Sequence, residues 1–369
     1  MTKRISTVSL ALVTLGSLTL AGCATSAETP APATESTDST TEAMPSYEGQ
    51  ELVVTSFGGD WEKALISAVV IPFEAATGAD VKLVTAYSAD ALAQLEASKD
   101  NPQFDVVHFS GGQEVTAAAA GLLDPISADQ LSNYADLQPF AVAGLDLGQG
   151  PVIQVTPVGL VFRNDLGLPT PTSWADVFAA DYAGAVALTD FSNTYGVLSM
   201  LRVNDALGGT IDDPSAAIDQ LGALAQSGDA VVVATSAELQ TAFVERGIAL
   251  APYAQDYAQT LITAGIPVEF ITPSEGLTAS FITASAVAGT GKEDLAKLFI
   301  DYTLSPQAQA TFATLMRYAS VNTATEIPEN IQSSVLSPAE VGNVLRYDPT
   351  TIADNRQAWT DQWNNLIAK

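Results

Sequence analysis

PVIQVTPVGLVFRND at residues 151–165 and PVEFITPSEGLTASFITASAVA at residues 267–288 are two long apolar passages that decide the predicted fold. Each passage is interrupted by two prolines, which favour extended edges and bends over regular central strands. Their length and extended character indicate that the chain crosses twice between two lobes. Each lobe is therefore discontinuous in sequence.

Short β-rich runs alternate with amphipathic helical stretches around these two passages. Such alternation requires crossover connections and a sheet covered on both faces, which predicts the α/β class. Apolar residues at Trp61, Leu65, Val69 and Phe73 recur every four positions and predict one buried helix stripe. The predicted strands are LVVTSF (52–57), VKLVTAY (81–87), FDVVHFS (104–110), AVALTD (185–190), AVVVATS (230–236) and IALAPY (248–253).

Composition excludes several classes of function. The 369 residues contain 14 Lys plus Arg against 42 Asp plus Glu, for a formal net charge of −28. Such a field repels nucleic acid and anionic membrane surfaces. One Cys permits no internal disulfide, and one His excludes His-cluster metal sites.

The N-terminus predicts export and lipid anchoring. Lys3 and Arg4 precede an apolar run that ends in Leu-Ala-Gly-Cys, so residues 1–22 are interpreted as a signal peptide. The sequence Leu-Ala-Gly-Cys at residues 20–23 resembles the lipobox of bacterial lipoproteins, which implies that Cys23 is acylated. Residues 23–49 are rich in Thr, Ser, Ala, Pro and Glu and predict a flexible tether. We expect a protein anchored to the outer face of the cytoplasmic membrane, in a periplasm or at the cell surface.

Candidate binding residues follow the ends of predicted strands, where α/β sheets bind ligands beside helix N-termini. Trp61 could equally be a core residue, Ser192 or Asn193 could be a simple helix N-cap, and Asp256 could be solvated surface. An Asp beside tyrosines suits an ammonium group through charge pairing and cation–π contact. His108 is interpreted as a packed core residue. The candidates are Phe57, Gly58 and Trp61, then Ser110 and Gly111, then Asp190, Ser192, Asn193 and Tyr195, and finally Tyr253 and Asp256.

Four segments make the chain similar to extracellular solute-binding proteins of bacterial ABC importers, in the branch of spermidine/putrescine and ferric-iron binders. They are VVTSFGGDWEKALISAVVIPFEAATGADV (53–81), FDVVHFSGG (104–112), PTSWADVFAADYAGAVALTD (171–190) and EDLAKLFIDYTLSPQAQATFATLMRYASVN (293–322). The resemblance implies a two-lobed, hinge-closing periplasmic-binding-protein fold of type II. It adds Glu275 and Tyr318 as cleft residues. The implied lobes are residues 50–155 with roughly 272–320, and 156–271 with roughly 321–369.

The resemblance also implies a function: capture of a small solute and delivery to ABC permease and ATPase subunits, without enzymatic activity. Polyamines or related organic cations are favoured, although Asp190 is followed by Phe-Ser-Asn rather than by the several acidic residues of polyamine binders. Tyr253 and Tyr257 are four positions apart, unlike the tyrosine pair of ferric-iron binders. An amino acid-like solute, an organic acid, ferric iron or a cell-surface hydrolase remain alternatives. We expect a monomer with no cofactor, metal or nucleic acid.

Overall fold

The fold comes from a computed structural model that describes residues 45–368. The predicted signal peptide, the lipidation of Cys23 and the tether as far as residue 44 lie outside the described residues. Between residues 45 and 368, no helix combines the length and the hydropathy that a membrane crossing requires.

The described strands form one mixed sheet with the order β2-β1-β3-β10-β5-β8-β6-β7, while β4 pairs with β10 and β9 with β5. All six predicted strands are present, each shortened or shifted by a few residues. The α/β prediction is confirmed. The strands are β1 Glu51–Ser56, β2 Asp80–Thr85, β3 Val106–Phe109, β4 Leu123–Asp124, β5 Val152–Arg163, β6 Val186–Thr189, β7 Ala230–Val233, β8 Leu250–Ala254, β9 Val268–Ile271 and β10 Thr278–Val287.

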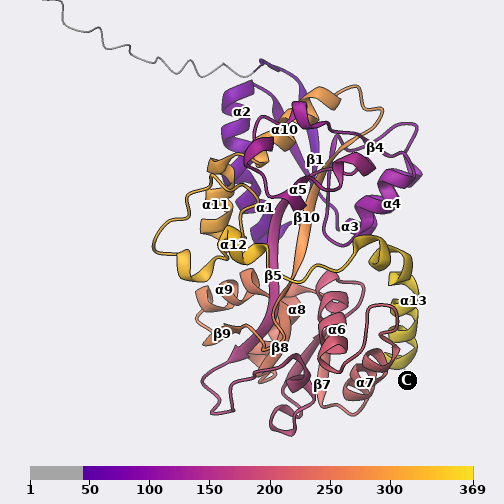
Figure 1. The fold of residues 1–369 in the computed structure, drawn as a ribbon, viewed down its shortest axis with the longest axis vertical. Coiled ribbons are helices and arrows are strands. Elements are labelled where there is room, and N and C mark those ends of the chain that lie inside the picture. Colours follow the sequence, from indigo (N-terminus) through magenta and orange to yellow (C-terminus); the bar gives the residue numbers. More distant parts are fainter. Residues whose placement is uncertain (1–44, 369) are drawn as a thin grey trace, which may run out of the picture. The chain divides into compact units, whose positions relative to one another are not determined.

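The two deciding passages form the middle of this sheet. The first passage is the twelve-residue strand β5, and the second divides into β9 and β10. β5 pairs antiparallel with β10 through its first half and with β8 and β9 through its second half. Both long strands run from one half of the described chain into the other (Figure 1). These strands therefore carry the chain between two separately packed groups of elements.

Helices cover both groups. The predicted stripe from Trp61 to Phe73 is buried, but it spans α1, a π-helical turn and α2 rather than one regular helix. The α-helices are α1 Gly59–Leu65, α2 Ile71–Thr77, α3 Ser88–Ala97, α4 Gln113–Ala119, α5 Pro139–Val142, α6 Thr194–Ala206, α7 Ser215–Gln226, α8 Ser236–Glu245, α9 Gln255–Thr263, α10 Glu293–Thr303, α11 Pro306–Met316, α12 Pro338–Val341 and α13 Pro349–Ile367.

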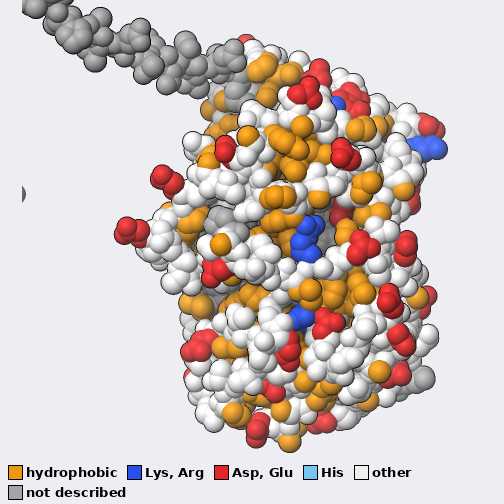
Figure 2. Space-filling view, viewed as in Figure 1, with side chains coloured by type: hydrophobic (Ala, Val, Ile, Leu, Met, Phe, Trp, Pro, Cys, Tyr) orange, Lys and Arg blue, Asp and Glu red, His pale blue; other side chains and the backbone are white. Residues whose placement is uncertain are grey.

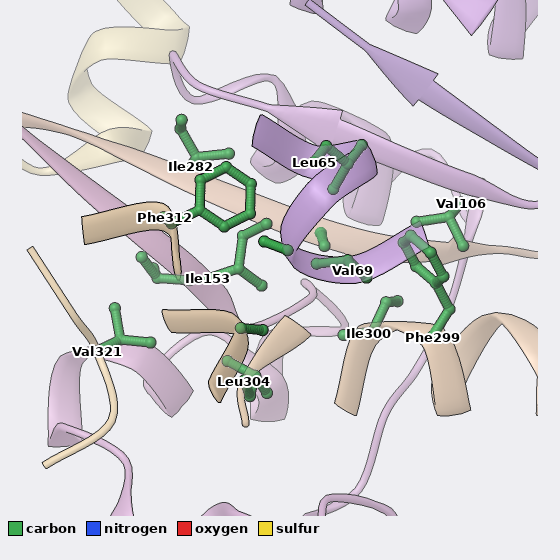
Figure 3. Packing of buried hydrophobic residues seen from close by; sticks show 14 of the residues in the cluster. Leu65, Val69, Val106, Ile153, Ile282, Phe299, Ile300, Leu304, Phe312 and Val321 are labelled. Atoms are coloured by element: carbon green, nitrogen blue, oxygen red, sulfur yellow. The ribbon is translucent and has the colours of Figure 1, made fainter. Parts of the chain in front are cut away.

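Two large hydrophobic cores, together with three smaller clusters, hold the groups of residues 45–368 together. The first core joins α1, α10 and α11 to β5 and β10; Figure 3 shows Leu65, Phe299 and Phe312 converging in it. The second core joins α6, α7 and α13 to β6, with Trp174 and Trp363 fully buried. Apolar burial of this kind contributes roughly 25 cal/mol per Å². Each core is thus a stabilising unit of its own.

The C-terminal chain contributes to both cores. Val321 and Val341 pack in the first core, whereas Trp359 and Trp363 on α13 pack in the second. The chain therefore crosses a third time between Val341 and α13. Figure 2 shows acidic side chains scattered over the surface, with basic side chains near the middle of the face and hydrophobic ones around them.

Candidate functional site

Most of the predicted binding residues lie just after the ends of strands, in the region where the two cores meet. Phe57 follows β1 and Ser110 follows β3, both beside the first core. Asp190 follows β6, and Asp256 follows β8 in the first turn of α9. Carboxyl ends of parallel strands lie at one edge of a sheet, which explains why loops distant in sequence converge.

An aromatic group forms the first-core side. The ring of Trp61 lies 4.8 Å from Phe57 and 5.1 Å from His108. The Trp61 Nε1 donates a 3.0 Å hydrogen bond to Oε1 of Gln154, on β5. This bond fixes the orientation of the Gln154 amide and leaves its Nε2 without a hydrogen-bond partner in the described structure. Trp61 is therefore both a core residue and a positioning residue.

Tyrosines form the second-core side. The ring of Tyr253 lies 4.8 Å from Tyr195 and 5.0 Å from Tyr257. The Tyr253 hydroxyl shares a 2.8 Å hydrogen bond with Ser236 Oγ at the start of α8. Burial raises the pKa of Tyr195 and of Tyr253, so both remain neutral phenols. They present polarised rings and hydroxyls to their surroundings without adding charge.

Asp256 is the charged group of this region. The residue is half-buried, its Oδ1 atom is fully buried, and its Oδ2 lies 3.5 Å from the hydroxyl of Tyr318, which comes from the first core. Its Oδ1 has no hydrogen-bond partner among the described residues, and none of their ion pairs involves it. Burial raises the pKa of Asp256 to about 7. A carboxylate held in this way lacks the cation that normally compensates a buried charge.

Several buried polar atoms around Asp256 share this lack of a partner. We call Gln154, Thr156, Tyr195, Asp256 and Tyr318 the Asp256 cluster. Nε2 of Gln154, Oγ1 of Thr156 and Oδ1 of Asp256 are all buried without a hydrogen bond within residues 45–368. The pKa of Tyr318 responds to Asp256, Thr156 and Tyr195, which places the four together. Because most buried polar atoms in proteins are hydrogen-bonded, these atoms are available to bond to a polar solute.

Asp190 and its neighbours occupy a more structural position. The carboxylate of Asp190 accepts hydrogen bonds from Nε1 of Trp363 at 2.9 Å and from the Ser192 amide at 2.9 Å. The side chain of Asn193 accepts from the amide of Tyr195 at 3.0 Å, so Asn193 is the N-cap of α6. Both carboxylate oxygens of Asp190 therefore already accept hydrogen bonds, one from α13 and one from the loop that contains Asp190.

The glycine loops bring the two cores into direct contact. The carbonyl of Gly111 accepts a 3.2 Å hydrogen bond from Arg356 on α13. A Cβ at Gly111 would lie 2.6 Å from Oγ1 of Thr194 and 2.7 Å from Arg356, so no larger residue fits without displacement. Gly58 has a φ of 72°, which favours glycine, and its amide donates to Ser56 Oγ at 2.9 Å. Ser110 lies beside Ser88 and Ser280.

Glu275 does not join the Asp256 cluster. It is exposed in the loop between β9 and β10, where its carboxylate accepts hydrogen bonds from Ser173 and Ser274. His108 is fully buried, as its core interpretation predicts, and burial lowers its pKa to about 4. Its Nδ1 contacts the Thr55 carbonyl at 2.7 Å, and its Nε2 has no partner in the described chain.

Sequence reasoning missed Gln154 and Thr156. Both stand in a strand of otherwise apolar residues, two positions apart, so their side chains share one face of β5. Polar residues at that spacing in a buried strand were a readable signal. Arg356 gave no such signal, because only the tertiary fold brings α13 to the loop after β3.

Comparisons with known proteins address the family. A family model described as bacterial extracellular solute-binding protein matches residues 68–339. No curated protein shows significant similarity to the chain. Within residues 45–368, no group of three or more His, Cys, Asp or Glu side chains is arranged to hold a metal ion.

Solved structures share the fold at low sequence identity. An ABC transporter structure from Clostridium perfringens has a TM-score of 0.72 at 22% identity, covering 86% of this chain and 99% of that one. The Atu4243-GABA receptor has a TM-score of 0.73 at 23% identity, covering 87% and 98%. AgtB from A. tumefaciens, in complex with agropinic acid, has a TM-score of 0.69 at 17% identity, covering 88% and 100%. The periplasmic-binding-protein fold follows from these similarities.

Proposed function

The chain belongs to the bacterial extracellular solute-binding proteins, and from this premise we propose that it captures an organic solute carrying a protonated amine and delivers it to an ABC importer. The observation that carries the proposal is the buried, unpaired carboxylate of Asp256 among tyrosines. An ammonium group placed there would neutralise the charge and receive cation–π stabilisation from Tyr195 and Tyr318.

The number of free carboxylates favours one amine over two. Asp256 has a free oxygen, whereas the oxygens of Asp190 already accept from Trp363 and Ser192. A diamine such as putrescine would leave one ammonium buried without a carboxylate, which is costly. The polyamine hypothesis is therefore narrowed to solutes with a single protonated amine, a description that also fits GABA, the zwitterion named with the Atu4243 receptor.

The uncharged polar atoms of the Asp256 cluster suit the part of the solute that lies beyond its amine. Nε2 of Gln154 is a hydrogen-bond donor, while Oγ1 of Thr156 can donate or accept. Trp61 and Phe57 lie beside Gln154 and offer apolar surface. A solute with one amine and one or two neutral or anionic oxygen atoms fits these groups. Metabolites of the amino acid-like class meet that description.

Closure of two lobes around the solute is the proposed mechanism. Tyr318 and Gln154 belong to elements of the first core, whereas Tyr195 is on α6 of the second core and Asp256 is on α9, which packs in a smaller cluster that also contacts Tyr195. A solute touching all four stabilises only the arrangement in which they approach each other. Shifting a 1:99 equilibrium to 99:1 requires roughly 5.5 kcal/mol of such preference. We propose the same lobes, except that the first extends past residue 320 to include Val321 and Val341, which pack in the first core.

Export and anchoring complete the proposal. Signal cleavage before Cys23 and acylation of its thiol would hold the protein at the membrane, with the tether giving reach toward the permease. A solute receptor held close to its transporter meets it at a high effective concentration.

Calorimetry on the body from residue 45 tests the function. A panel would contain monoamines, ω-amino acids, putrescine, spermidine, sugars, organic acids and ferric iron. We expect saturable 1:1 binding of a single-amine compound, lost in Asp256→Asn and retained in the matched exposed control Asp294→Asn. Binding only of a compound without an amine would overturn the amine assignment, and tight binding of a diamine would overturn the single-amine assignment.

A further inference from the structure

A cavity lies beside β5 and β10, and it shares no lining residue with the Asp256 cluster. Its volume is about 60 Å³, and its walls come from α4, α5, β5, β10 and residues 346–349. Apolar walls are provided by Phe140, Val152 and Phe281. We call it the hinge cavity, because it lies against both crossing strands and the C-terminal crossing segment.

Three polar side chains of the hinge cavity lack partners. Oε2 of Glu114 and Oγ1 of Thr283 are buried without a hydrogen bond within the described residues. Glu114 and Thr283 are 6% and 4% exposed, so neither group is satisfied by bulk water. Arg346 is an exposed residue, and its guanidinium takes part in none of the ion pairs found between residues 45 and 368.

Aromatic rings hold Arg346 in place. Its Cζ lies 4.5 Å from the centre of the Phe281 ring and 5.2 Å from that of Phe140. Stacking of this kind uses the face of the guanidinium and leaves its N–H edge available. That edge matches the two oxygens of a carboxylate, with which Arg forms paired hydrogen bonds.

We propose that the hinge cavity binds a short-chain carboxylate, with Arg346 pairing its oxygens, Thr283 and Glu114 hydrogen-bonding to it, and Phe140 and Phe281 enclosing its alkyl group. A cation is disfavoured because Arg346 would repel it. At roughly 10–15 Å³ for each water-sized position, the cavity holds about four to six such positions. Acetate and propionate, with four and five heavy atoms, match this size.

Protonation of Glu114 supports binding of an anion. Burial raises the pKa of Glu114 to about 7, while the nearby Arg356 opposes the rise. The charged group that acts on it is Arg356 from α13, while Arg346 and Tyr347 from the crossing segment line the same cavity. A neutral Glu114 donates a hydrogen bond to a carboxylate, whereas an ionised one repels it. Carboxylate affinity should therefore be higher at pH 6 than at pH 8.

Occupancy would link the two cores. Glu114 and Thr283 lie on elements beside the first core, while Tyr347 bonds to Asp205 on α6 in the second-core group. A carboxylate joining Arg346 to Thr283 would stabilise the arrangement in which the crossing segment lies against β10. The hinge cavity is thus placed to bias the opening of the two lobes independently of the solute.

Titration of the protein with acetate and propionate, followed by NMR of backbone amides or by calorimetry, tests the proposal. We expect saturable 1:1 binding that perturbs residues 281–283 and 346–349. Arg346→Gln should weaken it at least tenfold, and Arg346→Lys should weaken it nearly as much because the planar fork is lost. Arg246→Gln removes an exposed Arg of the same charge and should leave it unchanged.

The variants also separate this proposal from the amine site. Asp256→Asn should abolish amine binding and leave acetate binding intact, whereas Arg346→Gln should do the reverse. Thr283→Val supplies a second test inside the cavity, and thermal melting verifies that each variant is folded. A response that never saturates, or one that Arg346→Gln and Thr283→Val leave unchanged, would show that the cavity holds only water and would overturn the proposal.

Discussion

Replacing Asp256 by Asn should stabilise the solute-free protein while removing solute binding. Burial raises the pKa of Asp256 from 3.8 to about 7. A buried acid with a raised pKa binds its proton more tightly when folded, so stability falls as pH rises from the unfolded pKa to the folded one. Asn has nearly the same shape as Asp but carries no charge, so the stability of the variant does not fall with pH for this reason.

The magnitude follows from the same values. Above pH 7 the full difference from 3.8 to about 7 costs about 4 kcal/mol at 1.36 kcal/mol per pH unit, as an upper bound. Part of this cost is already present at pH 5. Between pH 5 and pH 8, wild type should therefore lose up to about 3 kcal/mol relative to Asp256→Asn. Glu114 titrates in the same range but is present in both proteins, so its effect cancels in the comparison.

Urea denaturation of both proteins at pH 5 and pH 8, without solute, measures this difference. The free energy of unfolding of the variant should exceed that of wild type by more at pH 8 than at pH 5. Binding of a permanently charged amine to wild type should strengthen about tenfold per pH unit from 5 to 7 and then level off. A stability difference that is the same at both pH values would refute the claim that Asp256 is buried without a cation.

Three further changes test other parts of the structure. Gly111→Ala should weaken solute affinity by about tenfold or more, measured by calorimetry, because its Cβ would press on Thr194 and Arg356 where the two cores meet. In urea melts, the wild-type protein should lose stability as pH falls from 6.5 to about 4, since burial lowers the pKa of His108 and the unfolded state takes up the proton first. His108→Gln should not show this loss. Cys23→Ala should release the protein from the membrane fraction, and retention after a carbonate wash would contradict the lipid anchor.

The sequence pattern predicted most of the fold because the buried faces of strands and helices carry apolar residues at regular spacings. The apolar runs at 52–57 and 248–253 correspond to β1 and β8, and the crossing passage at 151–165 corresponds to β5. The π-helical turn between α1 and α2 was not predictable, since an inserted residue leaves the buried stripe nearly unchanged. The split of the second passage into β9 and β10 depended on the turn at Gly276, where φ is 87°.

The candidate site was less predictable because partner choice is tertiary. The sequence placed Asp190 and Asp256 in equivalent loops, yet one lies against Trp363 and the other lacks a partner. That difference arises from α13, which packs beside β6 from more than 150 positions away. No local pattern encodes which of the two carboxylates such a helix will contact. Tyr318, by contrast, followed from the resemblance of its segment and does lie beside Asp256.

In the proposed site, the unpaired carboxylate of Asp256 lowers the stability of the solute-free protein and also provides a contact for the solute. A fold that satisfied Asp256, Gln154 and Thr156 internally would be more stable but would offer nothing to a solute. A ligand present at 100 to 1,000 times its dissociation constant stabilises a protein by roughly 2.7 to 4.1 kcal/mol. The upper bound of about 4 kcal/mol for the buried carboxylate is of the same size. Solute binding would thus offset the cost of the buried carboxylate, and it would further stabilise the arrangement in which Tyr318 lies beside Asp256.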